Sequence, residues 1–204
     1  MYKFAYYTEP DEQKVIDFMK AHPFAIITGT GENQPVATQI PLAIEEKDGK
    51  IFLHGHLMKK TDHHLAFEKN NAVLVIFTGP HCYVSASWYT NPHMGSTWNY
   101  MTVHAKGKIT YADEAGTVAA VRAITEKFEG KDSVAAFDQL STEYVDAMVK
   151  AIVGFTIEVE SMENTFKLSQ NRDDASKQNI IVQLKQRGDY NSLQIAQEME
   201  QRMD

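Results

Sequence analysis

YVSASWYTNPHMGSTWNYMTVHAKG, residues 83–107, contains both tryptophans of the chain, Trp88 and Trp98. Asn91-Pro92 and Gly95 lie between them and indicate a turn or loop. The stretch therefore predicts a strand, a loop and a second strand that bring aromatic faces and polar tips to one place. Aromatic side chains with polar tips suit a position where the ring contacts apolar groups and the tip contacts water. Local composition leaves two interpretations open: the core of a β-domain, or a ligand site.

The flanking sequence predicts short strands and amphipathic helices. Asp48-Gly49 is typical of a two-residue hairpin, and Thr78-Gly79-Pro80 indicates a turn. The apolar patterns predict strands over residues 24–28, 34–44, 50–55, 72–77 and 152–159, with 102–111 continuing the second tryptophan strand. Helices are predicted from the Glu9-Pro10-Asp11 segment to His22-Pro23, and over 62–69, 113–127, 141–150, 173–186 and 189–203. We expect a domain over residues 1–160, and a C-terminal motif with a helical extension over 161–204 that packs on that domain or on a second subunit.

Composition and charge narrow the classes of protein. Hydrophobic residues make up 43% of the 204 residues, an ordinary value for a globular protein, and no apolar run is long enough to span a membrane. Cys82 is the single cysteine, which excludes an internal disulfide and favours a cytoplasmic protein; we expect it to be a small buried side chain. The formal net charge of −7 makes direct DNA binding doubtful, because duplex binding depends on Lys and Arg neutralising phosphates.

The segment His54-Gly55-His56-Leu57-Met58-Lys59-Lys60-Thr61 leads from a predicted strand into a predicted helix. Free backbone N–H groups and cationic side chains converge at such a helix start, so the segment predicts an anion-binding site. Four histidines here, His54, His56, His63 and His64, also suggest a metal site. Their spacing matches no zinc motif, and no carboxylate or cysteine completes a ligand set, so we predict no metal.

Three motifs resemble one family. The segments YVSASWY, STWNY…VH and FKLSQNR, the last spanning Phe166 to Arg172, are similar to the PaiB family of FMN-binding negative transcriptional regulators. Ala86 stands where that family usually has Pro, and Gly95-Ser96 where it usually has Val-Pro. The resemblance implies a mainly β fold with helices: a six-stranded antiparallel FMN-binding split β-barrel, flanking helices and a C-terminal helical extension. It also implies a homodimer that holds each FMN at the subunit interface.

The resemblance assigns candidate FMN-binding residues. Lys59, helped by neighbours, would hold the phosphate, and residues of the strand over 34–44 would line the ring edge. Polar side chains of KLSQNR would share the ring site with the tryptophan motifs, although Ser169–Arg172 could instead cap the helix that follows. The full set is Thr38, Gln39, Ile40, His54, His56, Lys59, Lys60, Thr61, Trp88, Trp98, Asn99, Tyr100, Lys167, Gln170, Asn171 and Arg172.

No catalytic constellation is evident in the sequence. The G-x-S-x-G and G-x-G-x-x-G motifs are absent, since Gly29-x-Gly31 lacks a third Gly and a following helix. The flat ring and the phosphate of FMN match the remaining features, an aromatic wall and a cationic helix start. Three interpretations stay open: a PaiB-type regulator that binds FMN, a flavin oxidoreductase of the same fold, or a chain that binds haem or a partner protein in place of flavin.

Overall fold

Seven strands form one sheet. The structure is a computed structural model, and it describes Met1 and residues 4–203. The strands are β1 Phe24–Thr30, β2 Pro35–Pro41, β3 Ala43–Lys47, β4 Lys50–Met58, β5 Ala72–Val84, β6 Thr97–Tyr111 and β7 Ile152–Lys167. Their order is β2-β1-β5-β6-β7-β4-β3, with antiparallel neighbours such as β1–β2 and β4–β7. A mainly β fold is confirmed. The predicted number of six strands is wrong, because the described sheet has seven strands, and this sheet is not closed between β2 and β3.

One predicted strand, over residues 34–44, is two strands in the structure. The break lies at Leu42, whose side chain is 1% exposed and whose backbone N–H donates to the carbonyl of Pro23 at 2.9 Å. Pro41, just before it, has no N–H to donate to a neighbouring strand. The chain therefore leaves β1 after Pro41 and pairs with β4 from Ala43 onward.

The described residues also form six α-helices and three short 3₁₀-helices. The α-helices are α1 Glu12–Ala21, α2 Asp62–Lys69, α3 Glu114–Glu129, α4 Thr142–Ala151, α5 Asp174–Arg187 and α6 Tyr190–Glu200, and the 3₁₀-helices are η1 Ala5–Tyr7, η2 Ala86–Trp88 and η3 Phe137–Gln139. All six predicted helices are therefore present, with ends that differ by a few residues. None of them is both long and apolar enough to cross a bilayer.

The chain forms two compact units. Unit 1 comprises Met1–Phe18, Thr78–Val103 and Glu163–Asp204, and unit 2 comprises Met19–Phe77 and His104–Met162. The predicted division into residues 1–160 and 161–204 falls inside β7, and it stays a prediction.

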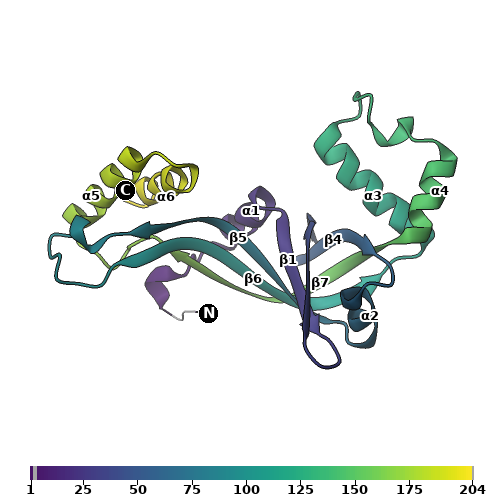
Figure 1. The fold of residues 1–204 in the computed structure, drawn as a ribbon, viewed down its shortest axis with the longest axis horizontal. Helices are drawn as coiled ribbons and strands as arrows, with labels where there is room; N and C mark the ends of the chain where they lie inside the picture. Colours follow the sequence, from purple (N-terminus) through teal and green to yellow (C-terminus); the bar gives the residue numbers. More distant parts are fainter. Residues whose placement is uncertain (2–3, 204) are drawn as a thin grey trace. The chain divides into compact units, whose positions relative to one another are not determined.

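Unit 2 is built on two hairpins and a pair of helices. β1 pairs with β2, and β3 pairs with β4 through the Asp48-Gly49 turn, whose φ angles of 52° and 72° suit a two-residue hairpin as predicted. Alternate strand residues such as Ile27, Leu53 and Val75 are 0% exposed, which places one face of each strand in the core. α3 and α4 pack together beside this sheet (Figure 1).

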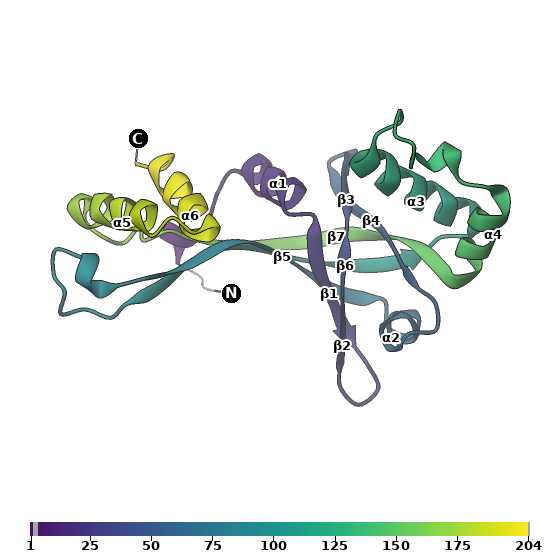
Figure 2. The ribbon, with the colours of Figure 1, turned by 45° about the horizontal axis from the view of Figure 1, so that its top comes forward.

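Unit 1 places two helices against one face of the β5–β6 ribbon. Figure 2 shows α5 and α6 together on one side of that ribbon. Their buried apolar side chains are Ile180, Ile181, Leu184, Ile195, Ala196 and Met199. Gly188 ends α5 in the left-handed conformation, with φ at 75°, a position that glycine adopts without a steric cost. The predicted break between the helices over residues 173–186 and 189–203 is thus confirmed.

The structure corrects three local predictions. β5 runs through Thr78-Gly79-Pro80 without a turn, because the fixed φ of proline is compatible with extended backbone. The predicted first tryptophan strand ends at Val84, where the Ser85 side chain accepts from the Ser87 N–H and starts η2. β7 continues to Lys167 and so includes the first residues of FKLSQNR.

Two aromatic residues of the helix pair α3 and α4 are exposed, Phe128 at 60% and Tyr144 at 58%. Phe128 lies in the last turn of α3, under the Lys127 ammonium at 5.5 Å, and Tyr144 lies in the first turn of α4, where Val149 fills the buried position. Cys82 is buried as predicted, and burial raises the pKa of its thiol to about 11.

β6 and β7 approach each other closely at Gly107. A Cβ added there would lie 2.2 Å from the carbonyl oxygen of Glu158. We expect Gly107→Ala to lower the free energy of unfolding by about 1–3 kcal/mol, because the added methyl forces a shift in packed backbone. Urea denaturation measures this loss. Gly95→Ala is the matched control, since nothing lies within 4 Å of its added Cβ. Equal midpoints for the two variants would contradict the prediction.

Candidate functional site

The two family motifs meet in unit 1. Ser169 Oγ donates to Asn99 Oδ1 at 3.0 Å across 70 residues of sequence, and Lys167 Nζ donates to Thr97 Oγ1. Ser169 is 2% exposed and Asn99 is 0% exposed, so this hydrogen bond is removed from water. KLSQNR and STWNY thus lie against each other. Their role toward a flavin stays a prediction.

KLSQNR forms a tight turn whose amide groups bond within the turn. Ser169 has a φ of 61°, and the Arg172 N–H donates to the Ser169 carbonyl at 3.0 Å. Gln170 Oε1 accepts from the Leu168 N–H at 2.7 Å, while its Nε2 donates to the Phe166 carbonyl. Asp173, not the SQNR string, caps α5 by accepting from the Ser176 N–H at 2.9 Å, and this bond lowers the pKa of Asp173 to about 2. Gln170 therefore shapes the turn.

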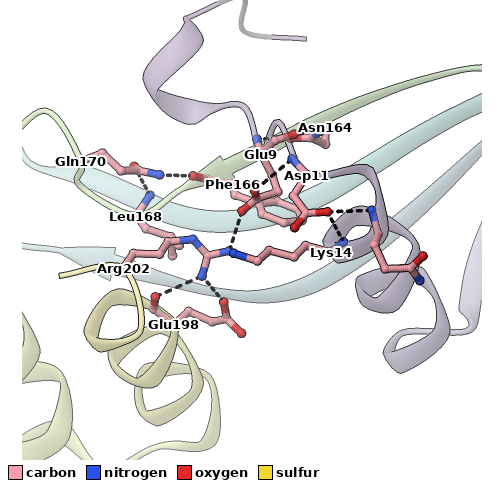
Figure 3. A network of polar contacts seen from close by, with 10 residues as sticks. Glu9, Asp11, Lys14, Asn164, Phe166, Leu168, Gln170, Glu198 and Arg202 are labelled. Carbon is pink, nitrogen blue, oxygen red and sulfur yellow. Dashed lines mark hydrogen bonds and ion pairs between the residues drawn. The ribbon is translucent and has the colours of Figure 1, made fainter. Parts of the chain in front are cut away.

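A polar network supports this turn from the side of α6. Figure 3 shows the Arg202 guanidinium between the carboxylates of Glu9 and Glu198. Arg202 Nη2 lies 3.3 Å from Glu9 Oε2, Nη1 lies 2.5 Å from Glu198 Oε2, and the guanidinium carbon is 5.7 Å from the Phe166 ring centroid. Asn164 adds two hydrogen bonds to the backbone of Glu9, at 2.8 and 3.0 Å. The end of β7 is therefore held on both sides of Phe166.

Two cationic side chains project from the turn. The guanidinium carbon of Arg172 lies 4.2 Å from the Tyr89 ring centroid, and its Nη1 donates to Met94 Sδ at 3.2 Å. Lys167 is half-buried; desolvation and the charge of Arg172 lower its pKa below the usual value. Asn171, between them, is exposed.

An aromatic recess opens on the exposed face of the β5–β6 ribbon. It has a volume of about 440 Å³, and its lining residues are Thr78, Gly79, His81, Trp98, Tyr100, Met101 and Thr102. The indole N–H of Trp98 donates to His81 Nδ1 at 3.2 Å, and the two rings stack at 5.9 Å. Trp88 is placed elsewhere, under the Arg187 guanidinium at 4.8 Å, and its carbonyl accepts from Asn179 of α5. Trp98 and Tyr100 therefore line one recess, whereas Trp88 contacts α5.

The predicted anion-binding segment lies in unit 2 at the start of α2. Thr61 is the N-cap, and its hydroxyl accepts from the His64 N–H and donates to the Met58 carbonyl at 3.0 Å. Lys59 Nζ donates to the Val149 carbonyl at 2.9 Å, which ties this lysine to α4. Lys60 is exposed with a φ of 64°, a strained value for a side chain other than glycine. Lys60 is therefore the more available of the two ammonium groups.

His56 carries the clearest sign of a missing partner in unit 2. Its Nδ1 is buried and has no hydrogen-bond partner in the described structure, and desolvation lowers the pKa of the imidazole below 6.5. Buried polar atoms are nearly always paired in native proteins, so this atom marks a place for a ligand or a water molecule. His54, two residues earlier on β4, is instead held between Glu45 Oε2 at 2.8 Å and Thr156 Oγ1 at 3.0 Å. An adjacent carboxylate disfavours a phosphate at His54.

The remaining candidates of unit 2 lie on β2 and α2. Thr38 and Ile40 are half-buried and Gln39 is exposed, on the strand that pairs with β1. His63 contacts Asp62 at 3.1 Å, and His64 lies 3.6 Å from Glu68. In the described part of the chain, no three His, Cys, Asp or Glu side chains converge in a way that could hold a metal ion.

The candidate residues predicted from the sequence do not include Glu9, Tyr89 or Arg202. Glu198 and Arg202 stand four residues apart, a spacing that predicts a pair on one helix face. The contact between Arg202 and Glu9 spans 193 residues and carries no local signal. Tyr89 belongs to the SWY motif, but only the structure shows that it is buried beneath Arg172.

Comparison with known proteins places the chain in a family. The family model described as "Putative FMN-binding domain" matches residues 1–161. Over 204 residues the chain is 33% identical to the protease synthase and sporulation protein PAI 2 of Bacillus subtilis, covering 100% of this chain and 98% of that protein. The chain belongs to the PaiB family. The match to this FMN-binding domain supports FMN as the cofactor, as the resemblance implied.

Two solved structures are similar to this chain in fold. The FAD and heme binding protein of Mycobacterium smegmatis is 16% identical with a TM-score of 0.60, covering 86% of this chain and 79% of that one. The flavocytochrome Anf3 of Azotobacter vinelandii is 13% identical with a TM-score of 0.61, covering 82% and 72%. At these identities the likeness shows that the fold is shared.

The bonds inside the KLSQNR turn lead to a test of its structural role. We expect Gln170→Ala to lower the free energy of unfolding by about 1–3 kcal/mol, because two hydrogen bonds that close the turn are lost. Chemical denaturation followed by circular dichroism measures the change. The exposed neighbour offers the matched control, Asn171→Ala, for which we expect little effect. Unchanged stability in Gln170→Ala would show that the turn forms without this amide.

Proposed function

We propose that this chain is an FMN-binding regulator of the split-barrel type. Its relationship to PAI 2, whose name places that protein in protease synthesis and sporulation, carries the proposal. The match spans both compact units, including KLSQNR, which lies beyond the residues that the family model covers. FMN, when bound, supplies a ring that can accept and release electrons.

The residues around His56 fit the phosphate of FMN. A phosphate oxygen would give the buried His56 Nδ1 the partner it lacks, and the exposed Lys60 ammonium would add a charge-assisted hydrogen bond. Lys59 and Thr61 keep the turn into α2 in shape through the Val149 and Met58 carbonyls. Thr38, Gln39 and Ile40 of β2 would line the ring edge. In this assignment His56 and Lys60 bind the phosphate, and Lys59 and Thr61 position it.

Regulation would act through the bound ligand or a partner protein. The net charge of −7 does not favour a phosphate backbone as the main partner. A cytoplasmic location fits the single buried Cys82. Oxidation of NADH or NADPH by the flavin-loaded protein would instead identify a flavin oxidoreductase.

The phosphate assignment predicts the effect of one substitution. We expect Lys60→Ala to weaken FMN binding by about 1.5–3 kcal/mol, because it removes a hydrogen bond to a charged group. Isothermal titration of the apoprotein with FMN measures the affinity. Lys69→Ala, at the exposed far end of α2, is the control that should bind as the natural chain does. Equal affinities for the two variants would place the phosphate elsewhere.

A homodimer completes the proposal. Tyr83 and Trp98 are 45% and 48% exposed on the bare face of the β5–β6 ribbon, and exposed aromatic surface of this kind typically marks an interface. Two-fold dimers are also the commonest soluble oligomers. We expect light scattering at micromolar concentration to give twice the mass of 23.1 kDa, and the double variant Tyr83→Ser, Trp98→Ser to shift it toward the monomer. A monomeric natural chain would refute the dimer.

A further inference from the structure

The guanidinium of Arg172 is covered on its face by an aromatic ring, and the N–H groups at its edge have few acceptors. Tyr89 covers the face at 4.2 Å. At the edge, Nη1 meets Met94 Sδ at 3.2 Å, and among the described residues no carboxylate pairs with this arginine. A thioether is a weak acceptor, whereas the N–H fork of arginine matches the oxygens of carboxylates and phosphates. The donor groups are therefore oriented but weakly engaged.

Lys167 adds a second positive charge to the same turn. Thr97 and Met94, which these two cations contact, belong to one short segment, so both side chains approach residues 94–97. Desolvation and the Arg172 charge lower the pKa of Lys167, the direction expected where a cation lacks water and lies near a like charge. A bound anion would relieve that repulsion.

Tyr89 supplies an independent observation. It is 6% exposed, and its hydroxyl has no hydrogen-bond partner in the described part of the chain. Such a buried hydroxyl usually has a partner, protein or not. The orphaned hydroxyl and the under-used guanidinium thus belong to side chains in direct contact.

Arg187 shows how a structural arginine differs in the same unit. It also stacks on an aromatic ring, that of Trp88, at 4.8 Å. Its Nη1, however, donates to the Tyr83 carbonyl at 2.9 Å and to Ser192 Oγ at 3.4 Å. Arg187 thus donates to two oxygen atoms of the protein, whereas the acceptor of Arg172 is the sulfur of Met94.

We propose that the KLSQNR turn binds a small oxyanion, a carboxylate or phosphate group, between Arg172 and Lys167 and beside Tyr89. The oxyanion would replace Met94 as the acceptor at the edge of Arg172. This site lies wholly in unit 1, on residues other than those assigned to the FMN phosphate. In a regulator, it is where an acidic small molecule would bind as an effector.

The test titrates the full chain with sodium phosphate and, separately, with sodium acetate, at constant ionic strength set by chloride. Lys60→Ala serves as the background, so that phosphate binding at the start of α2 does not contribute. The Nε–H signal of Arg172 in NMR spectra, assigned by its loss in Arg172→Gln, reports binding at the turn itself. Circular dichroism first establishes that each variant folds.

We expect a saturable shift of the Arg172 signal with at least one of the two anions, and affinity roughly 10- to 100-fold lower in Arg172→Gln, the range for lost hydrogen bonds to a charged group. Arg187→Gln is the matched control and should bind as the background does. Arg172→Lys should also weaken binding, because a lysine keeps the charge but lacks the planar fork. Preference for one anion identifies which group the natural ligand carries.

Three results would overturn the proposal. The first is an Arg172 signal that responds to neither anion, or that responds equally to added chloride. The second is equal affinity in Arg172→Gln and the background. The third is a loss of FMN affinity in Arg172→Gln without any binding of the small anions, which would assign Arg172 to the flavin. Failure of the flavin assignment itself would appear separately, as unchanged FMN binding in Lys60→Ala.

Discussion

The buried hydrogen bond between Ser169 and Asn99 is the constraint on which unit 1 depends. Both side chains are removed from water, and Asn99 Nδ2 also reaches Met199 Sδ of α6 at 3.6 Å. Leaving either polar group without its partner would incur its desolvation cost, so the turn and β6 have to form together. The register of that contact sets where Lys167 and Arg172 project. The KLSQNR motif therefore has a structural role in joining the turn to β6. This contact also fixes the positions of Lys167 and Arg172.

The sequence predicted the elements better than their junctions. Helices were found because caps such as Ser141 and Asp173 and the glycine at 188 give local signals. The break at Leu42 was missed, since it depends on a hydrogen bond to Pro23 from another part of the chain. Composition also suggested a turn at Thr78-Gly79-Pro80, although sheet pairing keeps that segment extended. The local sequence sets the propensity of a segment for helix, strand or turn. Where two of these conformations are close in energy, tertiary contacts decide which one forms.

The candidate site shows the same limit. The motifs identified Lys60, Trp98 and Arg172, but residue type alone could not distinguish an available group from an engaged one. Lys59 and Lys60 are adjacent and chemically alike, yet one is bound to a carbonyl and the other is exposed. Gln170 has an amide suited to a ring edge, yet both of its polar atoms are used inside the turn. The hydrogen-bond partners, which only the fold supplies, separate the two kinds of residue.

The placement of the two tryptophans gives the protein an internal optical reporter. Trp88 and Trp98 both belong to unit 1, one beneath an arginine and the other against His81. Intrinsic tryptophan fluorescence therefore follows unit 1 alone, whereas the amide signal in the far ultraviolet averages over the whole chain. Comparing the two signals during unfolding distinguishes the loosening of unit 1 from that of the rest of the molecule.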